Sequence, residues 1–170
     1  MQMKRKSDGN TSGTREELIM ELHTLKENEL LTGISILAVL RHAKQLELSK
    51  CILIEPLLSY SQVLNSLKRS NTRIKSIEDL IIKQSIAFAN FNNRFHDKLL
   101  LSINAIILFE KLGLLYRKDN LVHFSAPDFN FATKSLGEIA HSRISASGKL
   151  AEILQKGESS DFYLSLRIEI

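Results

Sequence analysis

The stretch of sequence that decides the fold covers residues 97–124 and reads DKLLLSINAIILFEKLGLLYRKDNLVHF. Its first part, residues 97–112, places apolar residues at steps of three and four, which is the period of an amphipathic helix. Gly113 follows at the position where a left-handed helix C-cap belongs. Two short β-prone runs then flank Asp119 and Asn120, which both tolerate a positive φ. The stretch therefore predicts a helix that runs directly into a tight hairpin.

A second amphipathic helix is predicted upstream, over residues 76–92, where apolar residues again recur at steps of three and four. Ser76 opens it with an S-x-x-D capping box. Two helices, a glycine and a two-residue hairpin follow one another in the order of a winged helix. We therefore expect a winged-helix-like unit over about residues 76–125, with Asp97 as the N-cap of the recognition helix and residues 114–124 as the wing.

The chain before this unit predicts a polar tail and two helices. Residues 1–13 are polar and without periodicity, and their basic KRK run is either solvated or touches phosphate. Thr14 then starts a capping box, and apolar residues follow at helical spacing. Asn28 is suited to cap a further helix over residues 29–46, which is apolar nearly all round and so is expected to be buried. The apolar residues of the first helix are Leu18, Leu22 and Leu25.

Two further regions complete the predicted fold. The run after Cys51 suits a buried strand or a helix, but Pro56 is awkward inside either, so we favour two short helices divided near Pro56 or Ser59. Residues 162–170 alternate strictly between apolar and polar, which predicts a half-buried C-terminal strand paired with the hairpin or with a partner chain. The expected fold is mainly α with a small β element, an α+β domain over residues 14–170.

Composition excludes several classes of protein. The 170 residues contain one cysteine, so an internal disulfide is impossible and a reducing, cytoplasmic location is expected. Apolar runs are no longer than five residues, whereas a membrane helix needs about 20. The N-terminus lacks the apolar core of a secretory signal. The net charge of +4 permits an acidic partner without requiring one.

No catalytic or cofactor motif is present. The sequence lacks GxxxxGK[ST], GxGxxG, HExxH and CxxC, and its five histidines show no metal-ligand spacing. Glu78, Asp79 and Lys83 superficially resemble a metal-dependent nuclease set. That set normally lies on a strand, however, while these residues begin a helix, where capping and the helix dipole explain the two acids. We therefore expect a non-enzyme that holds no cofactor and no metal.

The clearest charge feature is the run SLKRSNTRIK at residues 66–75, which has four cations and no acid. One interpretation is a loop that contacts nucleic-acid phosphates without sequence preference. The other is a solvated loop or one that faces an acidic protein. Two more cations at the tip of the wing would add to a phosphate footprint. The candidate nucleic-acid-binding residues are therefore Lys68, Arg69, Arg73, Lys75, Arg117 and Lys118.

The predicted recognition helix is poorly suited to reading bases. Residues 99–109 contain no arginine or lysine, and Asn104 is their one amide side chain. Packing against protein is therefore favoured over base readout. If this helix belongs to the core, Ile103→Asp should unfold the domain.

Several segments resemble the middle component of three-component ABC ATPase conflict systems, a small accessory protein of the kind found in Lamassu-type antiphage and antiplasmid systems. The resemblance begins with NELLTGISILAVLRHAKQLELSKCILIEPLLSY at residues 28–60, an apolar helix and an apolar run that closes on Pro-Leu-Leu. It continues through NAIILFEKLGLLYRKDNLVHF at residues 104–124 and ATKSLGEIA at residues 132–140, and it ends with FYLSLRIEI at residues 162–170.

This resemblance implies a non-catalytic subunit that sits with an SMC-like ABC ATPase and an effector, often a nuclease. Such a subunit would help the ATPase to clamp or sense foreign double-stranded DNA and would hold the effector in check. The resemblance implies no catalytic residue. The alternative that the residues leave open is a free-standing winged-helix transcription regulator.

Overall fold

The structure is a computed structural model that describes residues 29–71 and 73–170. The described part is mainly helical with a small antiparallel sheet, which confirms the predicted α+β class. After a helix over residues 29–43, the elements are β1 (Gln45–Glu47), α2 (Leu48–Cys51), α3 (Ile54–Leu58), α4 (Ser61–Lys68), α5 (Ile77–Lys83), α6 (Ser85–Phe88), α7 (Phe91–Lys111), β2 (Leu115–Lys118), β3 (Leu121–Phe124), the 3-10 turn η1 (Lys134–Leu136), α8 (Gly137–Leu154) and α9 (Ser159–Ser165).

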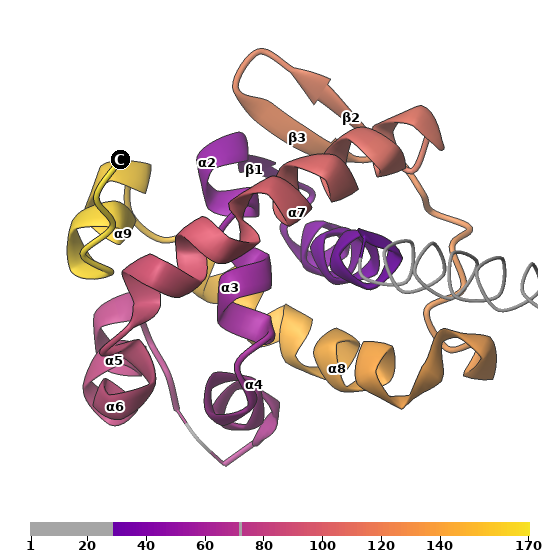
Figure 1. The fold of residues 1–170 in the computed structure, drawn as a ribbon. Coiled ribbons are helices and arrows are strands. Elements are labelled where there is room, and N and C mark those ends of the chain that lie inside the picture. Colours follow the sequence, from indigo (N-terminus) through magenta and orange to yellow (C-terminus); the bar gives the residue numbers. More distant parts are fainter. Residues whose placement is uncertain (1–28, 72) are drawn as a thin grey trace, which may run out of the picture.

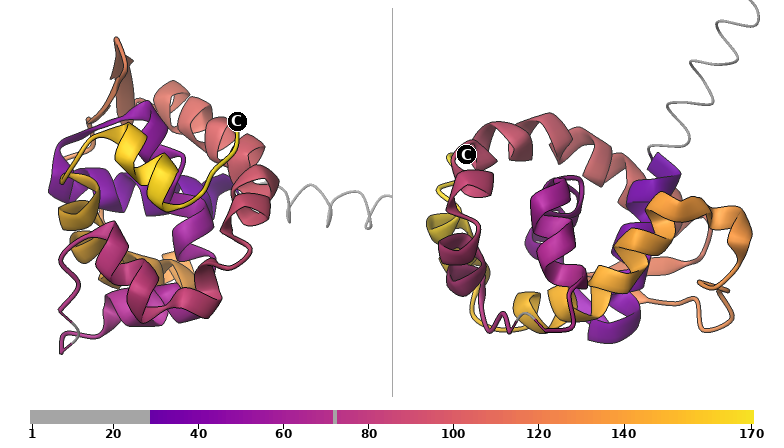
Figure 2. Two further views of the ribbon diagram at one scale, coloured as in Figure 1. Left: turned by 90° about the vertical axis from the view of Figure 1, so that its left-hand side faces the viewer. Right: turned by 90° about the horizontal axis from the view of Figure 1, so that it is seen from below.

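The helices surround the helix of residues 29–43. Figure 1 shows this helix in the middle, with α7 passing over one side and α8 over the other, and Figure 2 shows the same enclosure from two further directions. The hairpin of β2 and β3 lies at one end of the molecule, and the connection between α4 and α5 lies at the opposite end. One apolar cluster extends from the central helix to α9.

The central helix is buried as the sequence predicts. Ile36, Leu37 and Leu40 have no exposed surface. The helix ends at residue 43, earlier than the predicted residue 46, because Lys44 adopts a positive φ of 69° and the next three residues form β1. The glycine in the helix, Gly33, lies against α7 so closely that a Cβ there would be 2.0 Å from the ring of Phe109.

The predicted hairpin is confirmed, and the sheet has a third strand that the sequence pattern did not indicate. β2 and β3 pair antiparallel across a turn in which Asp119 has a φ of 55°. β1 adds to the other side of β3, so the strand order is β1-β3-β2. Leu46 of β1 is buried opposite Val122. A three-residue strand is too short to show alternation, and its neighbours continue the helical pattern.

The region around Pro56 forms short helices, which confirms the favoured interpretation. Pro56 is the third residue of α3, within the first turn, where a missing N–H removes no intrahelical hydrogen bond. Tyr60 then adopts an extended conformation and separates α3 from α4. Cys51 ends α2 and is completely buried.

The prediction of one helix over residues 76–92 and a second that begins at Asp97 is wrong. Gln84 and Asn90 leave the helical region, with φ values of −129° and −114°, so the first helix is broken into α5 and α6. α7 begins at Phe91, and Asp97 lies inside it rather than at its cap. The apolar spacing did not reveal these breaks because the segments on both sides of each break bury the same face.

The predicted C-terminal strand is also wrong, because residues 159–165 form α9. Phe162 and Leu166, four residues apart, are buried, whereas Leu164 is 76 % exposed. The buried residues of this segment therefore follow the spacing of a helix rather than the alternation of a strand. Arg167, with a φ of 53°, ends the helix, and the amide of Ile168 donates to the carbonyl of Tyr163 in the manner of a Schellman cap.

The expected polar tail, the helix that Thr14 would begin and the Asn28 cap all lie outside the described residues. Within residues 29–71 and 73–170, no helix has both the length and the apolar character needed to cross a membrane.

Candidate functional site

The basic loop predicted from the sequence connects α4 to α5. Arg69 ends α4 in an extended conformation, and Ser76 begins α5 by accepting a hydrogen bond from the amide of Asp79 at 3.3 Å. Between them, Ile74 is buried and fixes the loop to the core. The cations on either side of this anchor point outward from the core, since Lys68, Arg69, Arg73 and Lys75 are all exposed.

Helix α8 brings two more lysines to this loop. α8 packs against α4, and the Lys149 ammonium donates to the carbonyl of Arg69 at 2.5 Å. Two residues beyond the end of α8, Lys156 donates to the carbonyl of Lys75 at 3.0 Å. The side chain of Lys68 reaches back to α8 and donates to the hydroxyl of Ser142 at 2.7 Å. Residues about 80 positions apart in the sequence therefore form one positively charged area.

A third lysine reaches the loop from α5. Lys83 donates to the carbonyl of Arg73 and pairs with Asp79 at 3.0 Å. Asp79 also accepts a hydrogen bond from the amide of Lys75 at 3.0 Å. These contacts lower the pKa of Asp79, first through the Lys75 amide and then through the Lys83 ammonium. Asp79 therefore stays ionised and holds the loop while it offsets one of its charges.

We call this area the basic loop surface; it comprises Lys68, Arg69, Arg73, Lys75, Lys83, Lys149 and Lys156. Asp79 is an acid within this area. A lysine ammonium has three donors, so Lys156 can hold a loop carbonyl and still donate to a phosphate oxygen. The arrangement is suited to bind an anionic chain such as a nucleic-acid backbone. Sequence spacing could not reveal the α8 contribution, because nothing in the sequence shows that α8 packs beside this loop.

The two other candidate residues lie elsewhere. Arg117 and Lys118 end β2 at the hairpin, which is at the opposite end of the molecule from the basic loop surface (Figure 1). The Arg117 guanidinium donates twice to Glu110, at 2.6 and 2.9 Å, and its own amide donates to the same carboxylate at 3.2 Å. This pairing lowers the pKa of Glu110 and raises that of Arg117. The hairpin is therefore nearly neutral at this point, and the structure does not join all six candidates into one surface.

The middle of the outer face of α7 is apolar. Leu100 is 67 % exposed and Ile103 is 39 % exposed, and the two are one helical turn apart. The expectation that Ile103 belongs to the core is therefore wrong; Ile106, which is 2 % exposed, lies on the buried face instead. Arg94, near the start of α7, is held by the carbonyls of Pro56 and Ala87 and so belongs to the internal structure.

The described histidines are dispersed. His96 contacts the carbonyl of Glu169 at 2.8 Å, His141 contacts that of Thr133 at 3.0 Å, and the ring of His123 stacks on Tyr116. In residues 29–71 and 73–170, no three His, Cys, Asp or Glu side chains come together as they would to hold a metal ion.

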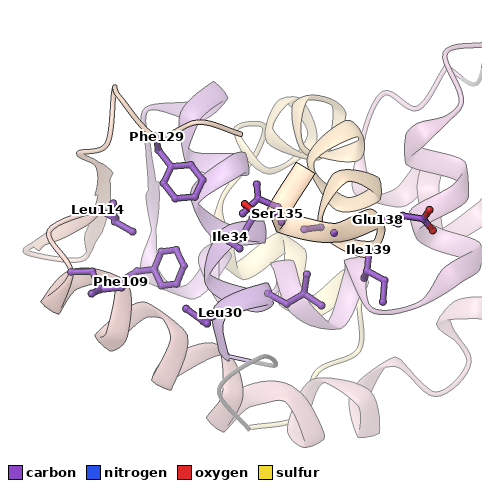
Figure 3. Close-up of a pocket in the computed structure, with 13 residues that line it drawn as sticks. Leu30, Ile34, Phe109, Leu114, Phe129, Ser135, Glu138 and Ile139 are labelled. Carbon is purple, nitrogen blue, oxygen red and sulfur yellow. The ribbon is translucent and has the colours of Figure 1, made fainter. Parts of the chain in front are cut away.

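An apolar groove of about 600 Å³ opens between the start of the central helix, the end of α7 and the start of α8. Figure 3 shows Leu30, Ile34, Phe109, Leu114 and Phe129 gathered around it, whereas the carboxylate of Glu138 points away. Three apolar side chains of its lining are strongly exposed: Leu30 (42 %), Leu112 (56 %) and Ile139 (64 %).

No family model, curated protein or solved structure matches this chain. The resemblance to conflict-system subunits therefore stays a prediction.

Proposed function

We propose that this protein is a non-catalytic accessory subunit of an SMC-like ABC ATPase defence complex, in which it contacts the backbone of double-stranded DNA and bridges the ATPase and an effector. The observation that carries the proposal is the basic loop surface, in which lysines of α5 and α8 join the four cations of one loop. The resemblance stated above supplies the identity of the complex.

The basic loop surface favours phosphate over base contacts. Its cations are lysines and arginines on an exposed loop and on helix ends, without an aromatic side chain among them. Such a surface neutralises backbone charge and displaces counterions whatever the base sequence is. It also lacks the stacking platform that proteins use for single strands. Duplex backbone is therefore the nucleic-acid ligand that this surface fits best.

The outer face of α7 favours contact with protein. Leu100 and Ile103 expose apolar surface in the middle of α7, and the exposed charged residues Asp97 and Lys111 lie before and after this pair. Burial of such side chains in an interface is favourable by about 25 cal/mol per Å² of apolar area. This face is the proposed contact with the ATPase or the effector, and the basic loop surface, carried by different elements, remains available for DNA.

DNA binding is tested by charge reversal in the assembled complex. Lys68→Glu, Arg69→Glu, Arg73→Glu and Lys75→Glu together should weaken binding to duplex DNA at low salt. They should also reduce the slope of log K against log salt by about 3 to 4, since each phosphate contact contributes about 0.9. Reversal of Lys118 at the hairpin is the matched control and should change binding little. Unchanged binding and slope in the fourfold variant would reject the phosphate role.

Membership of the complex is tested by copurification. The full chain should co-elute with a long coiled-coil ATPase encoded beside it, and Leu100→Asp should abolish co-elution while its melting temperature stays near that of the unsubstituted protein. A chain that elutes alone from that mixture contradicts the subunit role.

A second candidate function is a free-standing winged-helix regulator. The observation that favours it is the chain order of a helix, a short strand, further helices and a hairpin, with the short strand added to the returning strand of the hairpin. Sequence-specific binding of a short duplex by the purified chain alone, reduced by substitution of Asn104, would favour this alternative over the subunit.

A further inference from the structure

We infer that the DNA-binding surface crosses α8 and is completed by Lys44, so that a duplex lies across the C-terminal end of α8 and is contacted on both sides of this helix. This extension rests on the proposed function and deepens it, because it adds a binding residue from the end of the central helix and specifies how the duplex lies.

The end of α8 packs between the basic loop and the end of the central helix. On one side, two lysines that follow from α8 donate to carbonyls of the loop. On the other side, the side-chain amide of Gln155 donates to the carbonyl of Ala43 at 3.3 Å. A Cβ at Gly148 would lie 3.5 Å from the ring of His42. The loop, the end of α8 and the end of the central helix lie on the same side of the molecule in the right-hand view of Figure 2. A ligand that touches the loop therefore meets the end of the central helix directly across α8.

Lys44 has an unusual backbone conformation for a lysine. Its φ of 69° lies in the left-handed region, which glycine or asparagine adopts at lower cost. Its amide donates to the carbonyl of Leu40 at 2.7 Å, and its carbonyl accepts from the amide of Phe124 at 2.9 Å, so this conformation is fixed. The side chain is exposed, and no hydrogen bond or ion pair within the described residues involves its ammonium. An anion from outside the chain accounts for a lysine at this strained position.

One acid lies on the path across α8. Partial burial lowers the pKa of His42, the positive charges of Arg41 and Lys44 lower it further, and Glu152 raises it. These charges therefore lie close to one another around His42. Glu152 is exposed on α8, one helical turn after Lys149, which contacts the basic loop. It is the acid that a phosphate backbone would meet as it crosses the helix, so it should limit the affinity for DNA.

The width of α8 suits the two backbones of a duplex. A helix with its side chains is about 10–12 Å across, and the major groove of B-DNA is about 12 Å wide. The cations of the basic loop on one side of α8 and Lys44 on the other can therefore contact the two backbones that border one groove. A single strand has one backbone and would follow only one side.

Binding of a labelled, mixed-sequence duplex to the purified full chain at low salt tests the inference. Lys44→Asn removes the charge and introduces a residue that tolerates a φ of 69°, so the melting temperature should stay the same or rise. The slope of log K against log salt should become shallower by about 0.9, which is the contribution of one phosphate contact. Binding of a single strand of the same sequence should change less.

Arg167→Asn is the matched control for this substitution. Arg167 is also an exposed cation with a positive φ, of 53°, so the change in net charge and the backbone conformation are comparable. It lines a different groove, together with Phe88 and Asn92. Its substitution should leave duplex binding and the salt slope unchanged.

A second measurement uses the acid on α8. Glu152→Gln should tighten duplex binding about two- to threefold at low salt, because a charge that repels phosphate is removed. Glu138→Gln, which removes an exposed acid at the other end of the same helix, should have no effect.

Four results overturn the inference. The first is normal duplex binding by Lys44→Asn together with weak binding by the fourfold loop variant, which leaves the proposed function intact. The second is an equal loss in Lys44→Asn and Arg167→Asn, which attributes the effect to net charge. The third is an equal loss of duplex and single-strand binding in Lys44→Asn, and the fourth is unchanged or weaker binding by Glu152→Gln. If the unsubstituted chain does not bind duplex, or if neither the fourfold variant nor Lys44→Asn alters binding, the proposed DNA contact is wrong as well.

Discussion

The guanidinium of Arg143 lies 2.6 Å from the carboxylate of Glu55 in the interior, where the two side chains are 8 % and 3 % exposed. A second contact joins them at 3.3 Å, and the hydroxyl of Thr32 donates to the same carboxylate at 2.9 Å. The pair therefore ties α3 and α8 to the central helix. Nε of Arg143 has no hydrogen-bond partner among the described atoms, so the pair is not fully compensated.

Removal of one partner of this pair should destabilise the protein strongly. Glu55→Ala leaves the Arg143 charge buried without a partner, and we expect the free energy of unfolding to fall by about 3–5 kcal/mol in urea titration. The double variant Glu55→Leu with Arg143→Met should lose much less, because it buries no charge. A single variant with a loss under about 1 kcal/mol contradicts the burial of this pair.

Substitution of Gly33 should disturb the contact between the central helix and α7. A Cβ at this position would meet the Phe109 ring at 2.0 Å, so Gly33→Ala should cost about 1–3 kcal/mol of stability despite the better helix propensity of alanine. Gly148→Ala in α8 is the control, since its Cβ would be 3.5 Å from His42, an ordinary contact. If both variants melt at the same temperature, the close approach at Gly33 is absent.

Because Ile103 lies on the surface of α7 and Ile106 lies in the core, a charged substitution should be tolerated at the first position and not at the second. Ile103→Asp should retain a cooperative melting transition, because much of the side chain already contacts solvent. Ile106→Asp places a carboxylate in the core three residues away and should abolish that transition or lower its midpoint steeply. Loss of folding in the first variant and its retention in the second is the result that would reverse this assignment.

The thiol of Cys51 should be unreactive in the folded protein. Burial raises its pKa, so the thiolate, which is the reactive form, is suppressed, and access is blocked as well. We expect maleimide to modify it at least about tenfold more slowly in buffer than in denaturing urea. A rise to pH 9, which ionises an exposed thiol of pKa about 8.5, should not restore the rate in the folded state. Equal rates with and without urea are incompatible with a buried Cys51.

The sequence predicted those features that depend on local chemistry. The hairpin follows from Asp119 and Asn120 between β-prone runs, and the start of α5 follows from its serine cap. The burial of the central helix follows from apolar residues on all its sides. Local patterns failed where two structures share the same spacing: the alternation after Phe162 suited a strand, but contact with the core buried Phe162 and Leu166 on one side of a helix.

The candidate site also has one part that the sequence predicts and another that only the tertiary structure shows. The sequence by itself determined the cations of the loop, because residues 66–75 contain four positive residues and no acid. Only the tertiary structure decided that Lys149 and Lys156 join them, that Arg117 is neutralised by Glu110, and that Ile103 faces outward. The physical reason is that charge density and burial depend on which elements pack together, and packing of α8 on α4 joins residues about 80 positions apart.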